Sequence, residues 1–271
     1  MTDKSNPTPE LLPNSFESRE ALVQHVRNIT SWTTAEEPSH HLGGRNAGEA
    51  KLTQIKPKEY GRTRNHLAGD VSQLSPYIRH GIIGLAEARD AALAKVDKPA
   101  QAEKFVQELA WRDFWQRIYV AHPDWLWNNI EEYKTGWNTA DYATELPVDI
   151  TDGHTGVACI DHFIHDLTTT GYLHNHARMY LASYVVHWRR VTWQAGARWF
   201  LHHLLDGDPA SNNLSWQWIA STFSSKPYFF NLSNVQKYAD DTVNTSPKMN
   251  QVLDASYEDL EARLFPRKER S

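Results

Sequence analysis

The sequence contains a single cysteine and no long apolar run, and each of these shortages excludes a class of protein. The lone Cys159 excludes an internal disulfide and any four-cysteine zinc or iron–sulfur site carried by one chain. No stretch approaches the roughly 18–20 uninterrupted apolar residues that a membrane span needs. The N-terminus lacks the basic patch and apolar core of a secretory signal. We therefore expect a reducing, cytoplasmic compartment.

Basic residues are too few to give the whole molecule an attraction for nucleic acid. The 28 basic and 33 acidic residues leave a net charge of −5, so any DNA binding requires a local basic patch. Apolar residues make up 40% of the 271 residues and charged residues 23%, a composition typical of folded globular proteins that excludes wholesale disorder. Tryptophan is unusually frequent, with eleven residues in the chain. Ten of them lie between Trp111 and Trp218.

Apolar side chains recur at helical spacing, and no run shows the two-residue alternation of strands, so the sequence predicts an all-α fold. We expect a helix of about a dozen residues from residue 15, and further helices at about 44–56, from 75 onward, and at 99–120, 155–169, 172–190, 192–205 and 209–222. Pro57 is expected to end the second helix, and the polar segment 60–70 is expected to be a loop.

The helix expected at 172–190 carries polar residues on a face that is otherwise suited to burial. Asn175, Arg178 and Met179 share this face at spacings of three and four residues. A buried arginine needs an anionic partner, which Asp206 or Asp208 could supply. From spacing alone, a structural ion pair beside a helix cap is the simpler explanation.

A second polar and aromatic stripe lies on the helix expected at 99–120. Its members Glu108, Trp111, Arg112 and Trp115 share one face. A carboxylate, an arginine and two indoles on one stripe are costly to bury without partners. The stripe is therefore either the wall of a ligand site or the half-exposed face of an amphipathic helix with a salt bridge.

Five motifs occur in an order that resembles the FAD-binding domain of the DNA photolyase and cryptochrome family. They are Tyr60 with Arg64, the segment SQLSP at 72–76, ELAWRDF at 108–114, GYLHNHARM at 171–179, and DGDPASNNLSWQW at 206–218. The resemblance covers about residues 41–240 and implies a helical domain that holds FAD non-covalently. A tail with an extra helix is expected at 1–40 and a polar tail at 241–271. Because the family's α/β antenna domain is missing, we expect no antenna chromophore.

The resemblance implies which residues contact the cofactor. Tyr60 and the loop 72–75 would bind the FAD phosphates. Arg178, paired with Asp206, would face the flavin, whose buried polar atoms need fixed donors and acceptors. Asp208 would hydrogen-bond the flavin ring, and Asn212 would lie near its N5 atom. The predicted FAD-binding set is Tyr60, Val71, Ser72, Gln73, Leu74, Ser75, Phe105, Arg112, Asn175, Arg178, Asp206, Gly207, Asp208 and Asn212.

The resemblance also implies catalytic and substrate-binding residues. Trp216, Trp193 and Trp137 would carry electrons between the flavin and the surface, and Glu108 and Asn212 would also act in catalysis. Two indoles can sandwich flipped bases, and a carboxylate can accept a hydrogen bond from a base. The residues expected to hold a flipped pyrimidine dimer are Arg64, Glu108, Trp111, Asn175, Met179 and Trp218.

Three departures from the family weaken the expected contacts with phosphates. His176 and Phe230 stand where many members have arginines that would contact DNA, and Gln73 replaces an arginine of the phosphate loop. We therefore expect the partner to be damaged DNA that is single-stranded or distorted.

The sequence thus predicts a blue-light-absorbing flavoprotein that repairs cyclobutane pyrimidine dimers by electron transfer from reduced FAD. The alternatives are a cryptochrome-like photoreceptor without repair activity and a flavin-binding protein with neither activity. No metal is expected, because the histidine pairs are adjacent on helices and point about 100° apart. Cys159 is expected to be a small core residue, and Trp125 and Trp127 are expected to be packing residues.

Overall fold

The computed structural model describes residues 12–30 and 37–267, which form helices joined by turns. Among these residues no strand forms, and Ala143 pairs with Val191 in an isolated parallel bridge. The all-α prediction is confirmed. No helix in the described ranges combines the length and the apolar character that crossing a membrane requires.

The chain divides into two compact units, Met1–Pro38 and Ser39–Ser271. The first unit contains helix α1 (Arg19–Ile29), which begins near the predicted position. Ser18 caps it, because its Oγ accepts a hydrogen bond from the backbone N–H of Ala21 at 3.2 Å.

The second unit contains the remaining helices, and its N-terminal and central elements lie close to the ranges predicted from periodicity. They are α2 (Arg45–Gln54), α3 (Pro57–Thr63), α4 (Ser75–Arg79), α5 (Leu85–Leu93), α6 (Glu103–Ala121), α7 (Val148–Thr151), α8 (Ala158–Thr170), α9 (Asn175–Ser183) with a π-helical turn at Tyr184–Trp188, α10 (Trp193–His203), α11 (Pro209–Ala220), α12 (Leu232–Tyr238) and α13 (Tyr257–Leu264).

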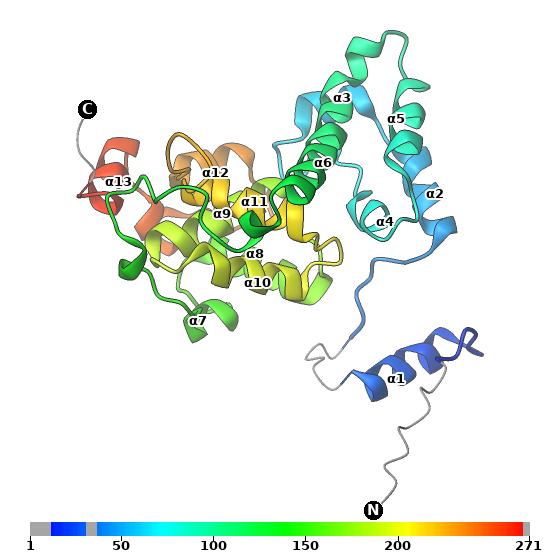
Figure 1. Cartoon of the computed structure of the whole chain (residues 1–271), viewed down its shortest axis with the longest axis horizontal. Coiled ribbons are helices and arrows are strands. Elements are labelled where there is room, and N and C mark those ends of the chain that lie inside the picture. Colours follow the sequence, from blue (N-terminus) through cyan, green and yellow to red (C-terminus); the bar gives the residue numbers. More distant parts are fainter. Residues whose placement is uncertain (1–11, 31–36, 268–271) are drawn as a thin grey trace, which may run out of the picture. The chain divides into compact units, whose positions relative to one another are not determined.

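Helix α6 joins two apolar cores of the second unit (Figure 1). Its N-terminal part packs with α2 to α5, where Phe105 is buried beside Tyr77 and Leu74. Its C-terminal part packs against α11, which belongs to the larger core built from α8 to α12. Cys159 is fully buried in that larger core, as predicted. The long helix therefore places residues of both cores beside one another.

The loop predicted at 60–70 is wrong over its first part, because α3 runs through Tyr60. Pro57 stands at the first position of α3, where its fixed φ and missing N–H fit a helix start. The sequence analysis took Pro57 as the end of a helix, but α2 has already ended at Gln54. A proline can follow the end of one helix and begin the next, so the position of Pro57 alone did not show which of the two it does.

The C-terminal segment of the second unit also packs. Leu260, Leu264 and Phe265 are buried and contact Trp188 and Phe229. Trp188 also donates a hydrogen bond from its indole N–H to Val252 O at 3.2 Å.

Candidate functional site

The turn between α10 and α11 holds a buried ion pair at the centre of the predicted cofactor site. Arg178 Nη2 lies 2.9 Å from Asp206 Oδ2, and the Arg178 Nε–H donates to Leu173 O at 2.7 Å. Asp206 is only 7% exposed. Burial by itself raises the pKa of the Asp206 carboxyl, but the Arg178 guanidinium outweighs it and holds the pKa below its usual value. Asp206 is therefore ionised and paired.

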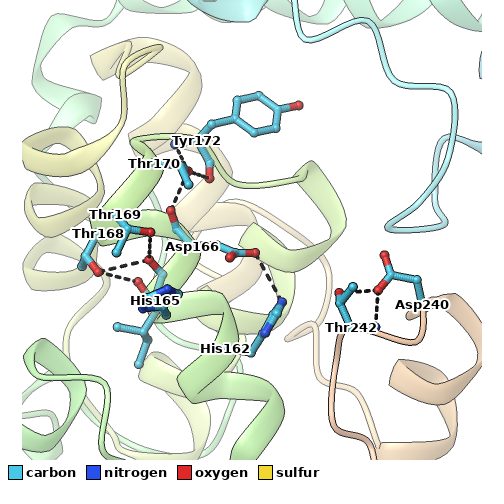
Figure 2. A network of polar contacts seen from close by, with 10 residues as sticks. His162, His165, Asp166, Thr168, Thr169, Thr170, Tyr172, Asp240 and Thr242 are labelled. Carbon is cyan, nitrogen blue, oxygen red and sulfur yellow. Dashed lines mark hydrogen bonds and ion pairs between the residues drawn. The ribbon is translucent and has the colours of Figure 1, made fainter. Parts of the chain in front are cut away.

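The end of α8 positions the segment that carries Arg178. Gly171 ends α8 with a φ of 69°, and a Cβ there would lie 2.8 Å from Leu205 Cγ, so glycine suits this turn. Figure 2 shows that Thr170 Oγ1 bonds the backbone of Tyr172, accepting from its N–H at 3.0 Å and donating to its carbonyl at 2.9 Å. The Tyr172 ring then lies 5.7 Å from the Arg178 guanidinium.

Asp208 connects α11 with α6. It is the N-cap of α11, and its Oδ1 accepts from the Ser211 N–H at 2.8 Å. Gln116 Nε2 donates to both Asp208 oxygens, at 2.8 and 2.7 Å, and Arg112 Nη2 lies 3.4 Å from Oδ2. A flavin contact to Asp208 would have to share these oxygens. The sequence analysis missed Gln116, although it lies one turn beyond Arg112 on the same face of α6.

The predicted phosphate loop borders a cavity of about 450 Å³ whose lining includes Lys51, Lys56 and Ser72. Gln73 has a φ of 51°, a conformation that is costly for a residue with a side chain. Its Oε1 accepts a hydrogen bond from Lys51 Nζ at 2.6 Å. The sequence analysis missed Lys51, since nothing in the linear sequence brings this residue to the loop. A lysine and backbone held in this conformation suit an anionic group.

Tyr60 lies on the other predicted wall of the cofactor site. Its ring meets Phe105 edge to face at 5.3 Å, which joins α3 to α6. Val71 is half-buried and also lines the cavity beside the loop, whereas Leu74 is buried in the smaller core. Ser75 opens α4 at the end of the loop.

Several buried polar atoms of this region lack a partner, which tests whether it suits a polar cofactor. His174 Nε2 and Ser211 Oγ are buried without a hydrogen-bond partner among the described residues. His174 Nδ1 accepts from the His176 N–H at 3.1 Å, so Nε2 carries the proton and remains a free donor. Orphaned buried donors are unfavourable unless a ligand or water satisfies them. The residues therefore fit FAD, whose ring and phosphates offer acceptors.

Helix α4 fixes the turn from its other side. The Arg79 Nε–H donates to Gly207 O at 2.6 Å, and His80 Nε2 lies 2.9 Å from Leu205 O. Asn212 follows in the first turns of α11, where its amide nitrogen donates to Ala197 O at 3.0 Å and Asn213 Oδ1 at 2.9 Å. The turn is thus held by hydrogen bonds from α4, α6 and α9.

Two of the predicted substrate residues, Trp111 on α6 and Trp218 on α11, lie on helices that pack together. Trp111 is 45% exposed and Trp218 is 42% exposed, so neither indole belongs to a core. Glu108 lies 3.4 Å from Arg64. On α9 the exposed Asn175 approaches the half-buried Met179, with Nδ2 at 3.9 Å from Sδ. The half-exposed stripe predicted on α6 is therefore present, and its charges pair with other helices.

The positions expected to face DNA phosphates are buried, and this corrects the sequence analysis. Phe230 is 0% exposed and packs against Tyr180 and Trp188, with ring centroids at 4.6 and 5.1 Å. His176 is 9% exposed between Tyr180 and Tyr238. Because an arginine at position 230 would bring a charge into an aromatic cluster, restoring it would destabilise the fold rather than supply a phosphate contact.

The three tryptophans of the predicted electron chain belong to or pack on the larger core. Trp193 and Trp216 are buried, and Trp193 donates from Nε1 to Asn129 Oδ1 at 2.7 Å. The Trp216 ring lies against Gly196, about one helical turn beyond Trp193 on α10. Trp137 is half-buried and donates from Nε1 to Leu264 O at 2.8 Å.

Two arginines lie over the Trp137 ring. The Arg190 and Arg267 guanidinium carbons are 4.4 and 4.2 Å from its centroid. These cations stabilise the neutral indole and oppose a positive charge on it.

In the described ranges, no group of three or more His, Cys, Asp or Glu side chains could hold a metal ion. On α8, His162 Nε2 lies 3.5 Å from Asp166 Oδ2, and Asp240 bonds Thr242 nearby (Figure 2). These contacts form a polar network rather than a ligand set.

Comparisons with known proteins agree with this architecture. A family model described as the FAD-binding domain of DNA photolyase matches residues 105–245, about half of the chain. A deoxyribodipyrimidine photo-lyase of Streptomyces griseus is 36% identical over 189 residues, which cover 68% of this chain and 40% of that protein. This chain thus spans less than half the length of that relative.

Two solved structures are also similar. An archaeal photolyase from Sulfolobus tokodaii, solved with two FAD molecules, has a TM-score of 0.61 and 30% identity, covering 74% of this chain and 45% of its own. A cryptochrome from Synechocystis has a TM-score of 0.66 at 24% identity, covering 78% of this chain and 47% of its own, and shows the shared fold.

Proposed function

Because this chain belongs to the family of the FAD-binding domain of DNA photolyase, we propose that it binds FAD and uses blue light to split cyclobutane pyrimidine dimers in DNA. When bound, FAD supplies the absorption of light and the electron that opens the dimer. The protein binds and orients both ligands and excludes water from the site.

The turn between α10 and α11 would hold the flavin part of the cofactor. Arg178 and Asp206 provide a fixed, buried pair of charges, and His174 and Ser211 provide unpartnered polar atoms. The loop around Gln73 and the nearby Lys51 would hold the phosphates, since the cationic side chain of Lys51 lines the adjoining cavity. Tyr60 and Phe105 would close the apolar side.

The exposed indoles of Trp111 and Trp218 carry the repair proposal. They lie on two packed helices, α6 and α11, and α11 also carries Asp208 and Asn212. Exposed tryptophans are costly in water, whereas two such rings can clasp a flipped pyrimidine dimer by stacking. Glu108, on the same face of α6 as Trp111, would accept hydrogen bonds from the dimer.

The test is light-dependent repair of a single-stranded oligonucleotide that carries one thymine dimer, using protein whose FAD is chemically reduced beforehand. We expect dimers to be lost under blue light and retained in the dark. Trp111→Ala or Trp218→Ala should weaken binding of the damaged strand about ten-fold or more, because each stacked ring contributes about 1–3 kcal/mol.

Trp127→Ala is the matched control, since Trp127 is 38% exposed but has no predicted role in repair. It should leave repair and damaged-strand binding unchanged. Absence of repair by parent protein loaded with reduced FAD would reject the proposal and favour the photoreceptor alternative.

A further inference from the structure

A series of aromatic ring contacts continues from Trp111 to residues of α6 and of the turns that follow α6 and α11. The centroids of Trp111 and Trp115 are 5.6 Å apart and their rings are nearly parallel. Trp115 lies 5.8 Å from Phe223, and Phe223 lies 6.2 Å from Trp125. Trp125 in turn stacks on His122 at 3.9 Å. We name these five rings the aromatic track.

The proposed repair chemistry does not explain this series beyond Trp111. Trp115, Phe223 and Trp125 are half-buried, and His122 is exposed, so each ring except Trp111 and His122 is partly covered by protein. The rings come from α6, from the turn that follows α6, and from the turn that follows α11. The series therefore brings together rings from segments about 100 residues apart, which the packing of one helix does not require.

Cationic side chains lie in the segments that carry the track. Lys226, three residues after Phe223, is exposed and forms no ion pair with any described residue. Arg117 pairs with Asp113 at 2.7 Å on α6, but both side chains are at least half exposed. Such surface pairs contribute little, so a phosphate can compete for the arginine.

We propose that the aromatic track binds the unpaired bases of a single DNA strand next to the damaged site. The proposal rests on the proposed function in placing the damaged bases at Trp111, where the track begins. Ring faces stack on bases of any sequence, while Lys226 and Arg117 meet the phosphates. Because the net charge of the protein is −5, ionic attraction to the phosphates depends on these local cations, and stacking supplies the rest of the binding.

The geometry favours a single strand over a duplex. In a duplex the face of each base is covered by its neighbours, so a row of rings can stack only on bases that have left the helix.

The experiment titrates FAD-loaded protein, in the dark, into an undamaged oligothymidylate of about eight nucleotides. Binding is followed by the fluorescence anisotropy of the labelled oligonucleotide. Trp115→Leu should weaken binding about ten-fold, because leucine keeps the apolar contact but removes the stacking face. Trp115→Phe should retain most of the affinity. Trp127→Ala, an exposed tryptophan outside the track, should bind as the parent does.

A second measurement separates the track from the dimer site. A damaged dinucleotide is too short to reach the track, so Trp115→Leu should bind it as the parent does, while losing the extra affinity of a longer damaged strand. Equal binding of oligothymidylate by parent and folded, FAD-loaded Trp115→Leu would overturn the proposal. The proposal would also be overturned if the parent protein were a homodimer and Trp115→Leu made it monomeric without changing its DNA affinity.

The outcomes also distinguish this proposal from the proposed function. If the track variants lose oligothymidylate binding but the parent repairs no dimers, the track stands and the repair activity fails. If the parent repairs dimers and Trp115→Leu binds both strands unchanged, the repair activity stands and the track fails.

Discussion

A single ion pair decides whether the buried turn at Asp206 is compatible with folding. Arg178 is three-quarters buried and has its charge balanced by Asp206 at 2.9 Å. Two ions removed from water are tolerated only while they remain paired. The same contact that stabilises the turn therefore also supplies the charged wall on which the proposed FAD site depends.

Asp206→Asn should lower the free energy of unfolding by roughly 3–5 kcal/mol, because it leaves the Arg178 charge buried without a counter-ion. FAD affinity should fall with it. Urea unfolding and FAD titration measure the two effects. Asp149→Asn, which breaks the more exposed Arg189–Asp149 pair, is the control and should leave FAD affinity unchanged. Undiminished FAD binding by Asp206→Asn would remove the pair from the site.

Trp216→Phe should block light-driven reduction of bound FAD, because phenylalanine is much harder to oxidise than tryptophan. Phenylalanine also fills most of the same buried volume, so the fold should persist. Repair by chemically reduced protein should continue, which distinguishes loss of the electron path from loss of the substrate site. Photoreduction at the parental rate, followed by absorbance, would mean that another aromatic residue is the first donor.

Helix α10 shows how one small residue sets the place of a large one. A Cβ built on Gly196 would lie 2.2 Å from Trp216 Cη2, a distance that real atoms do not tolerate. The absence of a side chain at this position lets α11 lay its indole directly on α10. The arrangement of these two helices thus depends on a glycine within a helix, where glycine itself is unfavourable.

Gly196→Ala should therefore destabilise the protein by about 1–3 kcal/mol, although alanine is the better helix former. Thermal unfolding measures the loss, and the fluorescence of Trp216 should change. The control is Gly84→Ala at the start of α5, where no atom lies within 4 Å of the added Cβ. Equal stability of the two variants would show that α10 and α11 can separate without cost.

Across the whole molecule, three buried histidines link stability to pH. Burial lowers the pKa of His174, His176 and His187 to about 4. In the unfolded chain each titrates near 6.5, so the unfolded state binds more protons between pH 6.5 and 4. Stability is therefore complete above about pH 6.5 and is lost as the pH falls toward 4.

The free energy of unfolding should fall by roughly 2 kcal/mol per buried histidine between pH 7 and pH 5. Urea unfolding at the two pH values measures the change. His176→Gln should show a smaller decrease than the parent, because one group no longer titrates. The exposed His154→Gln is the control and should keep the parental decrease. A parental decrease in His176→Gln would assign the acid sensitivity to other groups.

Much of the fold was determined by the sequence alone, because helical periodicity is a local property. Apolar spacing predicted the main helices, and the order of motifs predicted the family. The need of a buried arginine for an anion left Asp206 and Asp208 open as partners of Arg178, and the resemblance to the family selected Asp206. The helix at Tyr60 was missed because a proline can precede one helix and follow another.

Only the tertiary structure decided which side chains meet and which face water. Gln116 and Lys51 reach the site because α6 and α2 pack beside distant segments, and linear sequence holds no record of that packing. Phe230 is buried although its neighbours in sequence suggested a DNA-facing position. The aromatic track joins rings more than 100 residues apart. The sequence determines the residue types and the local helices. Helix packing in three dimensions determines which side chains are buried and which rings are in contact.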